Sequence, residues 1–211
     1  MAIDRTNRER ILKLTYLAAF TALVVILQLA GSFIKLGIFS ISAVLVPIVL
    51  GAAVCGRLAG AWLGLVFGIT VLISGDASAF LVVNPFGTVV TVLLKGALCG
   101  LAAGVVYRLI VDFGKYRKNA DNVSVSAKKI DGIRTYIAVV AAALVCPLVN
   151  TGVFLLGTFV FFWDTVSAWA NSDVIVEVIY FLIGFNWIFE IVLNIVLVPV
   201  IIRLLSLKRS I

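Results

Sequence analysis

The sequence predicts an all-α membrane protein: a six-transmembrane-helix bundle with both termini in the cytoplasm. Of its 211 residues, 63% are hydrophobic, and the mean hydropathy is +1.21, whereas soluble domains are about half apolar. The apolar residues gather in long runs, and roughly 20 such residues cross a bilayer as a helix. A chain of this length has room for about six such helices. We therefore expect a single membrane domain over residues 1–211, without a sizeable soluble part.

The distribution of charge indicates the orientation of the bundle. All 17 Lys and Arg residues except Lys35 and Lys95 lie where a six-span arrangement places the cytoplasm. The connections expected outside carry acidic residues instead, including Asp76, Asp164 and Asp173. Basic residues mark the cytoplasmic side of membrane proteins, and they contact anionic membrane lipid. The net charge of +7 is thus explained by topology, and nucleic acid is not an expected partner.

The expected spans follow one another with mostly short connections: residues 11–30, 38–55, 58–74, 87–110, 136–163 and 178–205. A basic segment, 1–10, precedes the first span. The second contains Pro47, which membrane helices tolerate because neighbouring groups satisfy the freed carbonyl, and a tight turn follows at Gly56. The longest polar segment, 112–134, is predicted on the cytoplasmic side. Residues 164–177 form an outer loop long enough to act as a lid.

Glycines recur at steps of four residues in the third and fourth spans: Gly56, Gly60, Gly64, Gly68, then Gly96, Gly100 and Gly104. Such ladders let membrane helices approach closely. The residues between these two spans, 75–86, are expected to form an outer connection, and Asn84-Pro85 marks a turn or a helix start.

Polar residues are predicted to form a layer in the outer half of the membrane. Helix rise, about 1.5 Å per residue, places Lys95 ~12 Å below the outer face, Asn150 and Glu190 ~9 Å, and Gln28 ~5 Å. Thr91 shares a helix face with Lys95. Ionisable residues at such depth are functional-site hypotheses. The layer suits a small, polar, partly aromatic molecule, and its candidate ligand-binding residues are Lys95, Asn150, Glu190, Asn186, Gln28, Thr91, Asn84 and Trp187.

Other interpretations of these residues stay open at this point. Lys95 could direct its ammonium group outward along its aliphatic stem, or Lys95 and Glu190 could form a purely structural ion pair. Asn194 alone is more typical of a hydrogen bond between helices than of a ligand contact.

The sequence offers little for catalysis or metal binding. It contains no histidine, which is the commonest general base and metal ligand. Cys55, Cys99 and Cys146 stand alone in apolar segments and are interpreted as small buried residues. We expect no catalytic residue, no cofactor and no metal. An intramembrane enzyme is an alternative, but Ser74 and Ser78 have no obvious base nearby. A membrane scaffold or sensor is another, although it would not need a polar layer.

Three stretches make the chain similar to the substrate-binding S components of energy-coupling factor (ECF) transporters. They are L-A-A-F-T-A-L (17–23), F-S-I-S-A-V-L-V-P-I-V-L-G (39–51) running into C-G-R-L-A-G-A-W-L-G (55–64), and F-N-W-I-F-E-I-V-L-N (185–194). The resemblance implies that the Ala-x-x-x-Ala motif, here Ala18 and Ala22, docks on a transmembrane T component.

The resemblance also implies a function. Such a subunit captures a water-soluble vitamin or related micronutrient outside a prokaryotic plasma membrane. It then topples within a complex that contains two ABC-type ATPases and releases the substrate inward. The chain has no phosphate loop of its own, so these partners would hydrolyse ATP. Riboflavin-specific members carry Asn-x-x-Lys in the sixth span, but here Asn186 is followed by Phe189 and Glu190, which disfavours flavin. Lys95 suits a carboxylate-bearing vitamin such as pantothenate, lipoate, biotin or folate.

Overall fold

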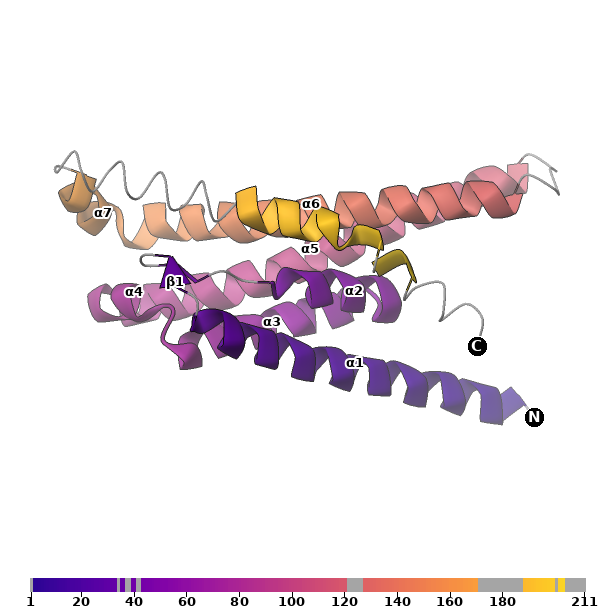
Figure 1. The fold of residues 1–211 in the computed structure, drawn as a ribbon, viewed down its shortest axis with the longest axis horizontal. Helices are drawn as coiled ribbons and strands as arrows, with labels where there is room; N and C mark the ends of the chain where they lie inside the picture. Colours follow the sequence, from indigo (N-terminus) through magenta and orange to yellow (C-terminus); the bar gives the residue numbers. More distant parts are fainter. Residues whose placement is uncertain are drawn as a thin grey trace.

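The computed structural model describes residues 2–33, 35–36, 39–40, 43–120, 127–170, 188–199 and 201–203. The labelled elements in this part of the chain are α1 (Ala2–Ser32), β1 (Lys35–Leu36), β2 (Phe39–Ser40), α2 (Leu45–Cys55), α3 (Arg57–Ser74), α4 (Ser78–Val83), α5 (Pro85–Ala120), α6 (Ala127–Phe161) and α7 (Trp163–Ala170). Residues 188–196 and 201–203 are also helical. The long helices lie side by side (Figure 1). Helices α4 and α7 lie at one end of the bundle, and the start of α1 lies at the opposite end.

Four of these helices are long and apolar enough to cross a membrane: Asn7–Ser32, Arg57–Ser74, Pro85–Phe113 and Gly132–Phe161. They contain the predicted spans 11–30, 58–74 and 87–110, and all but the last two residues of 136–163. The predicted span 178–205 lies partly outside the described residues. The fold is thus that of a helical, multi-pass membrane protein.

Within the expected span over residues 38–55, Phe39–Ser40 form strand β2 and helix α2 begins at Leu45, so the helix start was predicted wrongly. The preceding residues include a short antiparallel hairpin, in which β1 pairs with β2 and Lys35 lies opposite Ser40. The sequence explains this difference, because aromatic residues such as Phe39 favour extended backbone and serine competes with helix formation through its hydroxyl. The resulting helix, of eleven residues, is ~16 Å long and too short to cross a bilayer alone.

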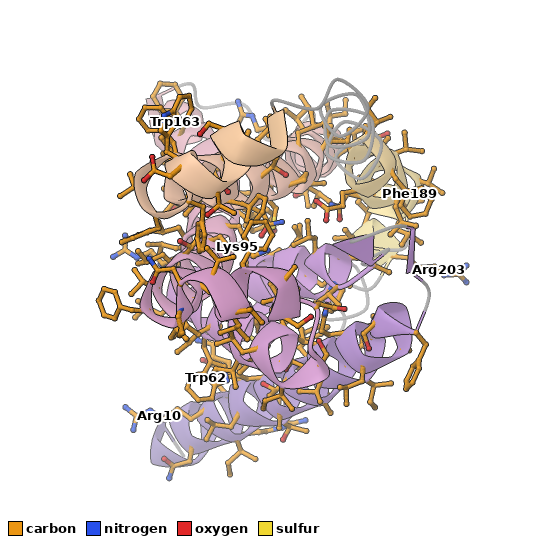
Figure 2. The ribbon with its side chains drawn as sticks, turned by 90° about the vertical axis from the view of Figure 1, so that its left-hand side faces the viewer. Arg10, Trp62, Lys95, Trp163, Phe189 and Arg203 are labelled. Carbon is orange, nitrogen blue, oxygen red and sulfur yellow. The ribbon has the colours of Figure 1, made fainter. Side chains whose placement is uncertain are left out.

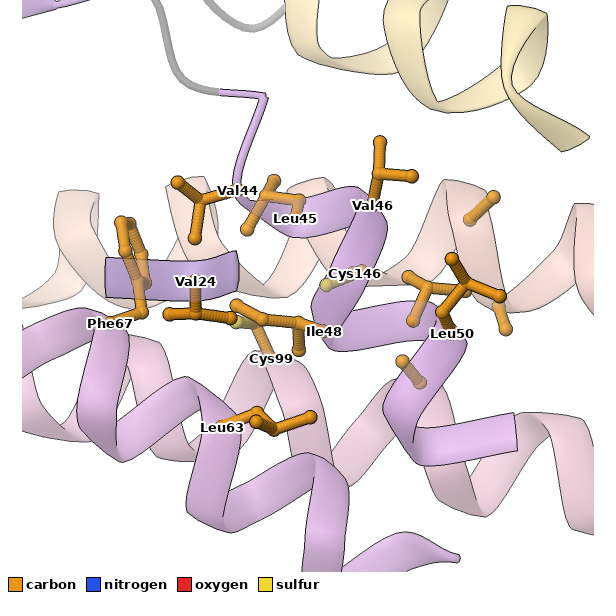
Figure 3. Close-up of a cluster of buried hydrophobic side chains, with 14 of the residues drawn as sticks. Val24, Val44, Leu45, Val46, Ile48, Leu50, Leu63, Phe67, Cys99 and Cys146 are labelled. Carbon is orange, nitrogen blue, oxygen red and sulfur yellow. The ribbon is translucent and has the colours of Figure 1, made fainter. Parts of the chain in front are cut away.

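Helix α2 lies in the middle of the bundle, where it contacts α1, α3, α5 and α6. Burial on all sides explains why it is apolar around its whole circumference rather than along one stripe. Figure 3 shows Leu45 and Ile48 of α2, and Val44 just before it, within the hydrophobic core near Val24 of α1 and Leu63 of α3. Other parts of the same core come from α5, α6, Val198 and Ile201.

Pro47 is the third residue of α2, and so it lies in the first helical turn. The N–H groups of this turn have no partner within the helix, so proline removes no hydrogen bond there. The tolerance of Pro47 therefore comes from its place at the helix start. The sequence had suggested that neighbouring groups satisfy a freed carbonyl, but at this position no carbonyl is freed.

The two glycine ladders face each other where α3 crosses α5. A methyl group added to Gly64 would overlap the carbonyl oxygen of Gly96, and one added to Gly60 would overlap that of Gly100. Further along the same crossing, a methyl group on Gly68 would lie 2.8 Å from the carbonyl oxygen of Val92. Backbone thus packs directly on backbone over several turns, which confirms the close packing that the glycine spacing predicted.

Gly56 joins α2 to α3 with φ of 109°. L-amino acids with a side chain rarely adopt this conformation, so the tight turn requires glycine. Two connections that the sequence predicted as outer loops contain helices. Residues 75–86 contain α4, and the expected loop over 164–177 begins within α7.

Candidate functional site

The face of α5 that carries Lys95 starts at a well-defined helix terminus. Asn84 precedes α5 with extended backbone, and its Oδ1 accepts a hydrogen bond of 2.9 Å from the N–H of Gly87. This is a helix N-cap, and Pro85 occupies the first helical position, where proline is favoured. Thr88 donates its hydroxyl to the carbonyl oxygen of Asn84 at 2.8 Å. Asn84, predicted as a ligand-binding residue, thus has a structural role in placing α5.

Lys95 lies in the interior of the bundle when it is viewed along the helices (Figure 2). Its Nζ is 5.2 Å from the ring centroid of Phe154 on α6 and 5.8 Å from that of Phe67 on α3. An ammonium group at such distances is attracted by the negative face of an aromatic ring. Both Glu190 and Asp76 lie near enough to attract the same group electrostatically. One cation therefore lies among two aromatic rings and two carboxylates.

Helices α5 and α6 pack in an antiparallel register that brings the predicted polar residues together. Thr91 lies against Gly157, where a methyl group would overlap its side chain, and Lys95 contacts Phe154. Further along, the thiols of Cys99 and Cys146 lie close together. Because Asn150 lies one turn from both Cys146 and Phe154, it occupies the level between the cysteine pair and Lys95. Asn150 is buried.

Residues 188–199, which are helical except at the turn residue 197, contribute a second polar face. Glu190, Asn194 and Val198 are spaced four apart and are all buried, as expected for one helix face turned toward the bundle. Glu190 influences both Lys95 of α5 and Cys146 of α6 electrostatically. The C-terminal helical segment thus places a carboxylate at the level where α5 carries its lysine.

Three buried polar atoms near this level have no hydrogen-bond partner among the described residues: Thr91 Oγ1, Asn150 Oδ1 and Asn194 Oδ1. Leaving a buried polar group unsatisfied costs about 1–3 kcal/mol. A fold normally avoids this cost, so such groups require an explanation. Two of the three atoms lie on the same helix faces as Lys95 and Glu190.

Gln28 is also buried, on α1. Its Nε2 donates a hydrogen bond of 2.6 Å to Oδ2 of Asp76, in the connection between α3 and α4. Asp76 in turn attracts Lys95. Gln28, which was predicted to contact a ligand, thus binds Asp76, and the carboxylate of Asp76 in turn attracts Lys95.

Three residues around Lys95 were not predicted from the sequence as parts of the site: Phe67, Phe154 and Asp76. The two phenylalanines stand in apolar helices that contain many similar residues, and only tertiary packing distinguishes them. Asp76 had a signal, because it is an acidic residue directly after Gly75, whose left-handed backbone ends α3. The predicted residues Asn186 and Trp187 lie outside the described part of the chain.

The predicted docking residues, Ala18 and Ala22, lie on an exposed face of α1. Larger exposed residues flank them on that face, Ile11 on one side and Ile26 on the other, each 62% exposed. Val24, on another face of the same helix, is fully buried in the core. The two alanines thus leave a shallow depression in an apolar surface.

Within the described residues, no group of three or more Cys, Asp or Glu side chains is placed to hold a metal ion. What the polar layer offers is recognition: one cation, two carboxylates and several amide or hydroxyl groups on different helices. Such a set can orient a small molecule by charge and hydrogen bonds.

The family model described as "ECF transporter, substrate-specific component" matches residues 12–202. No curated protein and no solved structure matches the chain. Members of this family are substrate-binding subunits of transporters and not enzymes. They bind small molecules and work with a T component and ATPases. The alternative of an intramembrane enzyme is thereby ruled out. Since the match covers almost the whole chain, the protein belongs to the substrate-specific components of ECF transporters.

Proposed function

We propose that the protein captures a water-soluble vitamin or related micronutrient through the polar layer around Lys95. The observation that carries this proposal is the convergence of Lys95, Asn150 and Glu190 on one level of an otherwise apolar bundle. Charges at this depth are costly, and the same level contains buried polar atoms without partners. A bound polar molecule would satisfy them.

The substrate we favour carries a carboxylate, as pantothenate, lipoate, biotin and folate do. The ammonium group of Lys95 is the only cation among the described residues of this layer, and charge-assisted hydrogen bonds to carboxylates are strong. The rings of Phe67 and Phe154 give apolar walls beside it. Trp187 and Asn186 remain proposed contacts of the same ligand.

The orientation and the transport step follow from the same proposal. The end with α4 and α7 would face outward, with both chain termini in the cytoplasm of a prokaryotic cell. Ala18 and Ala22 would dock on the T component, because small residues let a partner helix approach closely. Two ABC-type ATPases would supply the energy, and the subunit would topple to release its substrate inward.

The proposal is tested by mass spectrometry of the small molecule that co-purifies with the protein. We expect a water-soluble vitamin or a close relative, bound in a one-to-one ratio. Calorimetry with that molecule then measures the effect of Lys95→Ala and Asn150→Ala. Each substitution removes a buried polar contact worth about 1–3 kcal/mol and should weaken binding roughly fivefold to more than a hundredfold.

Gly152→Ala on α6 is the control, because a methyl group there meets nothing within 4 Å. It should bind as the unmodified protein does. Unchanged affinity in the Lys95 and Asn150 variants would remove these residues from the site.

A further inference from the structure

The charges around Lys95 restrict which ligands this layer accepts. Glu190 and Asp76 both lie near enough to Lys95 to attract its ammonium group, and the side chain of Glu190 is buried. Asp76 has a second partner, the side-chain amide of Gln28 at 2.6 Å. Among the described residues, two carboxylates therefore surround one cation before a ligand arrives.

A ligand whose only polar group is a carboxylate would add a third negative charge around this one cation. A buried charge without a compensating charge is strongly destabilising. Such a ligand would also bring no hydrogen to the acceptor atoms Asn150 Oδ1 and Asn194 Oδ1, which have no hydrogen-bond partner among the described residues.

A ligand that also carries N–H groups would resolve both difficulties. An N–H donor, or a protonated nitrogen, directed at Glu190 would compensate the carboxylate when Lys95 turns to the ligand. Glu190 and Asn194 lie one helical turn apart on the same face, so a ligand placed beside Glu190 is also within reach of an acceptor that needs a hydrogen.

We infer that Glu190 is the specificity-determining residue of this site and selects ligands that present a nitrogen donor. The inference rests on the proposed function. The favoured vitamins differ in this respect: pantothenate, biotin and folate carry N–H groups besides the carboxylate, whereas lipoate carries none. Pyridoxamine has an amine but no carboxylate, so it shows whether a nitrogen donor alone is enough for binding.

The test is calorimetry of the purified full chain with these five compounds, and with two variants. Glu190→Gln keeps the shape of the side chain and removes its charge. Glu9→Gln makes the same change at an exposed position near the start of α1 and serves as the control. Thermal unfolding without ligand checks that each variant is folded.

We expect a nitrogen-bearing compound to bind the unmodified protein and lipoate not to bind. Glu190→Gln should lower the affinity for the nitrogen-bearing ligand roughly ten- to a hundredfold, the range for a hydrogen bond to a charged group. The same variant should raise the affinity for lipoate, because the repulsion between two carboxylates is removed. Glu9→Gln should change neither.

Two outcomes would overturn the inference. Lipoate could bind the unmodified protein as tightly as the nitrogen-bearing compounds, or Glu190→Gln could leave the affinity of a nitrogen-bearing ligand unchanged. Either result leaves the vitamin-capture proposal standing. If none of the five compounds binds and the co-purifying molecule is not a vitamin, both the inference and the proposed function are wrong.

Discussion

At the scale of single residues, the most informative contact is the hydrogen bond between Gln28 and Asp76. It joins α1, the helix with the proposed docking face, to a carboxylate that attracts Lys95. The bond is largely buried at the Gln28 end. Such a bond matters most when one partner is removed, because the other then remains buried without its hydrogen bond.

Asp76→Ala and Asp76→Asn should therefore differ in stability. Alanine leaves the Gln28 amide without its acceptor and should lower the free energy of unfolding by about 1–3 kcal/mol. Asparagine retains an oxygen that can accept the same hydrogen, so its loss should be smaller. Thermal or denaturant unfolding in detergent micelles measures both. Equal losses in the two variants would show that the charge of Asp76 matters and the hydrogen bond does not.

At the scale of elements, the crossing of α3 and α5 determines where Lys95 is placed. The glycines at this crossing bring the two backbones into contact, and the ring of Phe67 on α3 thereby comes within 5.8 Å of Lys95. In a membrane, close approach of this kind supplies the van der Waals contact that holds helices together. The site thus depends on residues that have no side chain.

Gly64→Ala should destabilise the protein, because its methyl group would overlap the carbonyl oxygen of Gly96 and force the helices apart. We expect a loss of about 1–3 kcal/mol, typical of overpacking. Gly152→Ala is the matched control. Its methyl group meets nothing within 4 Å, and alanine is the better helix former by ~1 kcal/mol, so stability should be kept or raised. The measurement is the midpoint of thermal aggregation in detergent. If Gly64→Ala is as stable as this control, the crossing is looser than described.

At the scale of the whole molecule, much of the surface is apolar, as expected for a protein surrounded by lipid. The exposed side chains include Leu58 and Ile73 of α3 and Phe113 of α5. Lipid covers such large side chains without further specificity, so they alone do not mark a partner. The alanines of α1 differ from them because they make the surface shallow at one place.

Ala18→Trp should leave substrate binding by the isolated protein unchanged but abolish uptake by the complete transporter. The indole would fill the shallow depression where we propose the T component docks. Calorimetry and uptake of labelled substrate into cells measure the two effects. Ile73→Trp, at an exposed position on α3, introduces the same side chain elsewhere and should transport normally. Normal uptake by Ala18→Trp would refute the docking assignment.

The sequence by itself determined the class of the protein, its long helices and the close glycine packing. These features are local, because apolar length and a four-residue spacing can be read along one helix. It also indicated that Lys95, Asn150 and Glu190 share a depth, since helix rise converts position into height.

Only the tertiary structure decided what surrounds those residues. The short α2, the register that sets Lys95 beside Phe154, and the link from Gln28 through Asp76 to Lys95 all join segments that are distant in the sequence. The energies that fix them come from contacts between elements, and no single segment carries a pattern for them. Periodicity along one segment shows which face of a helix is polar, whereas tertiary packing decides which neighbouring helix that face contacts.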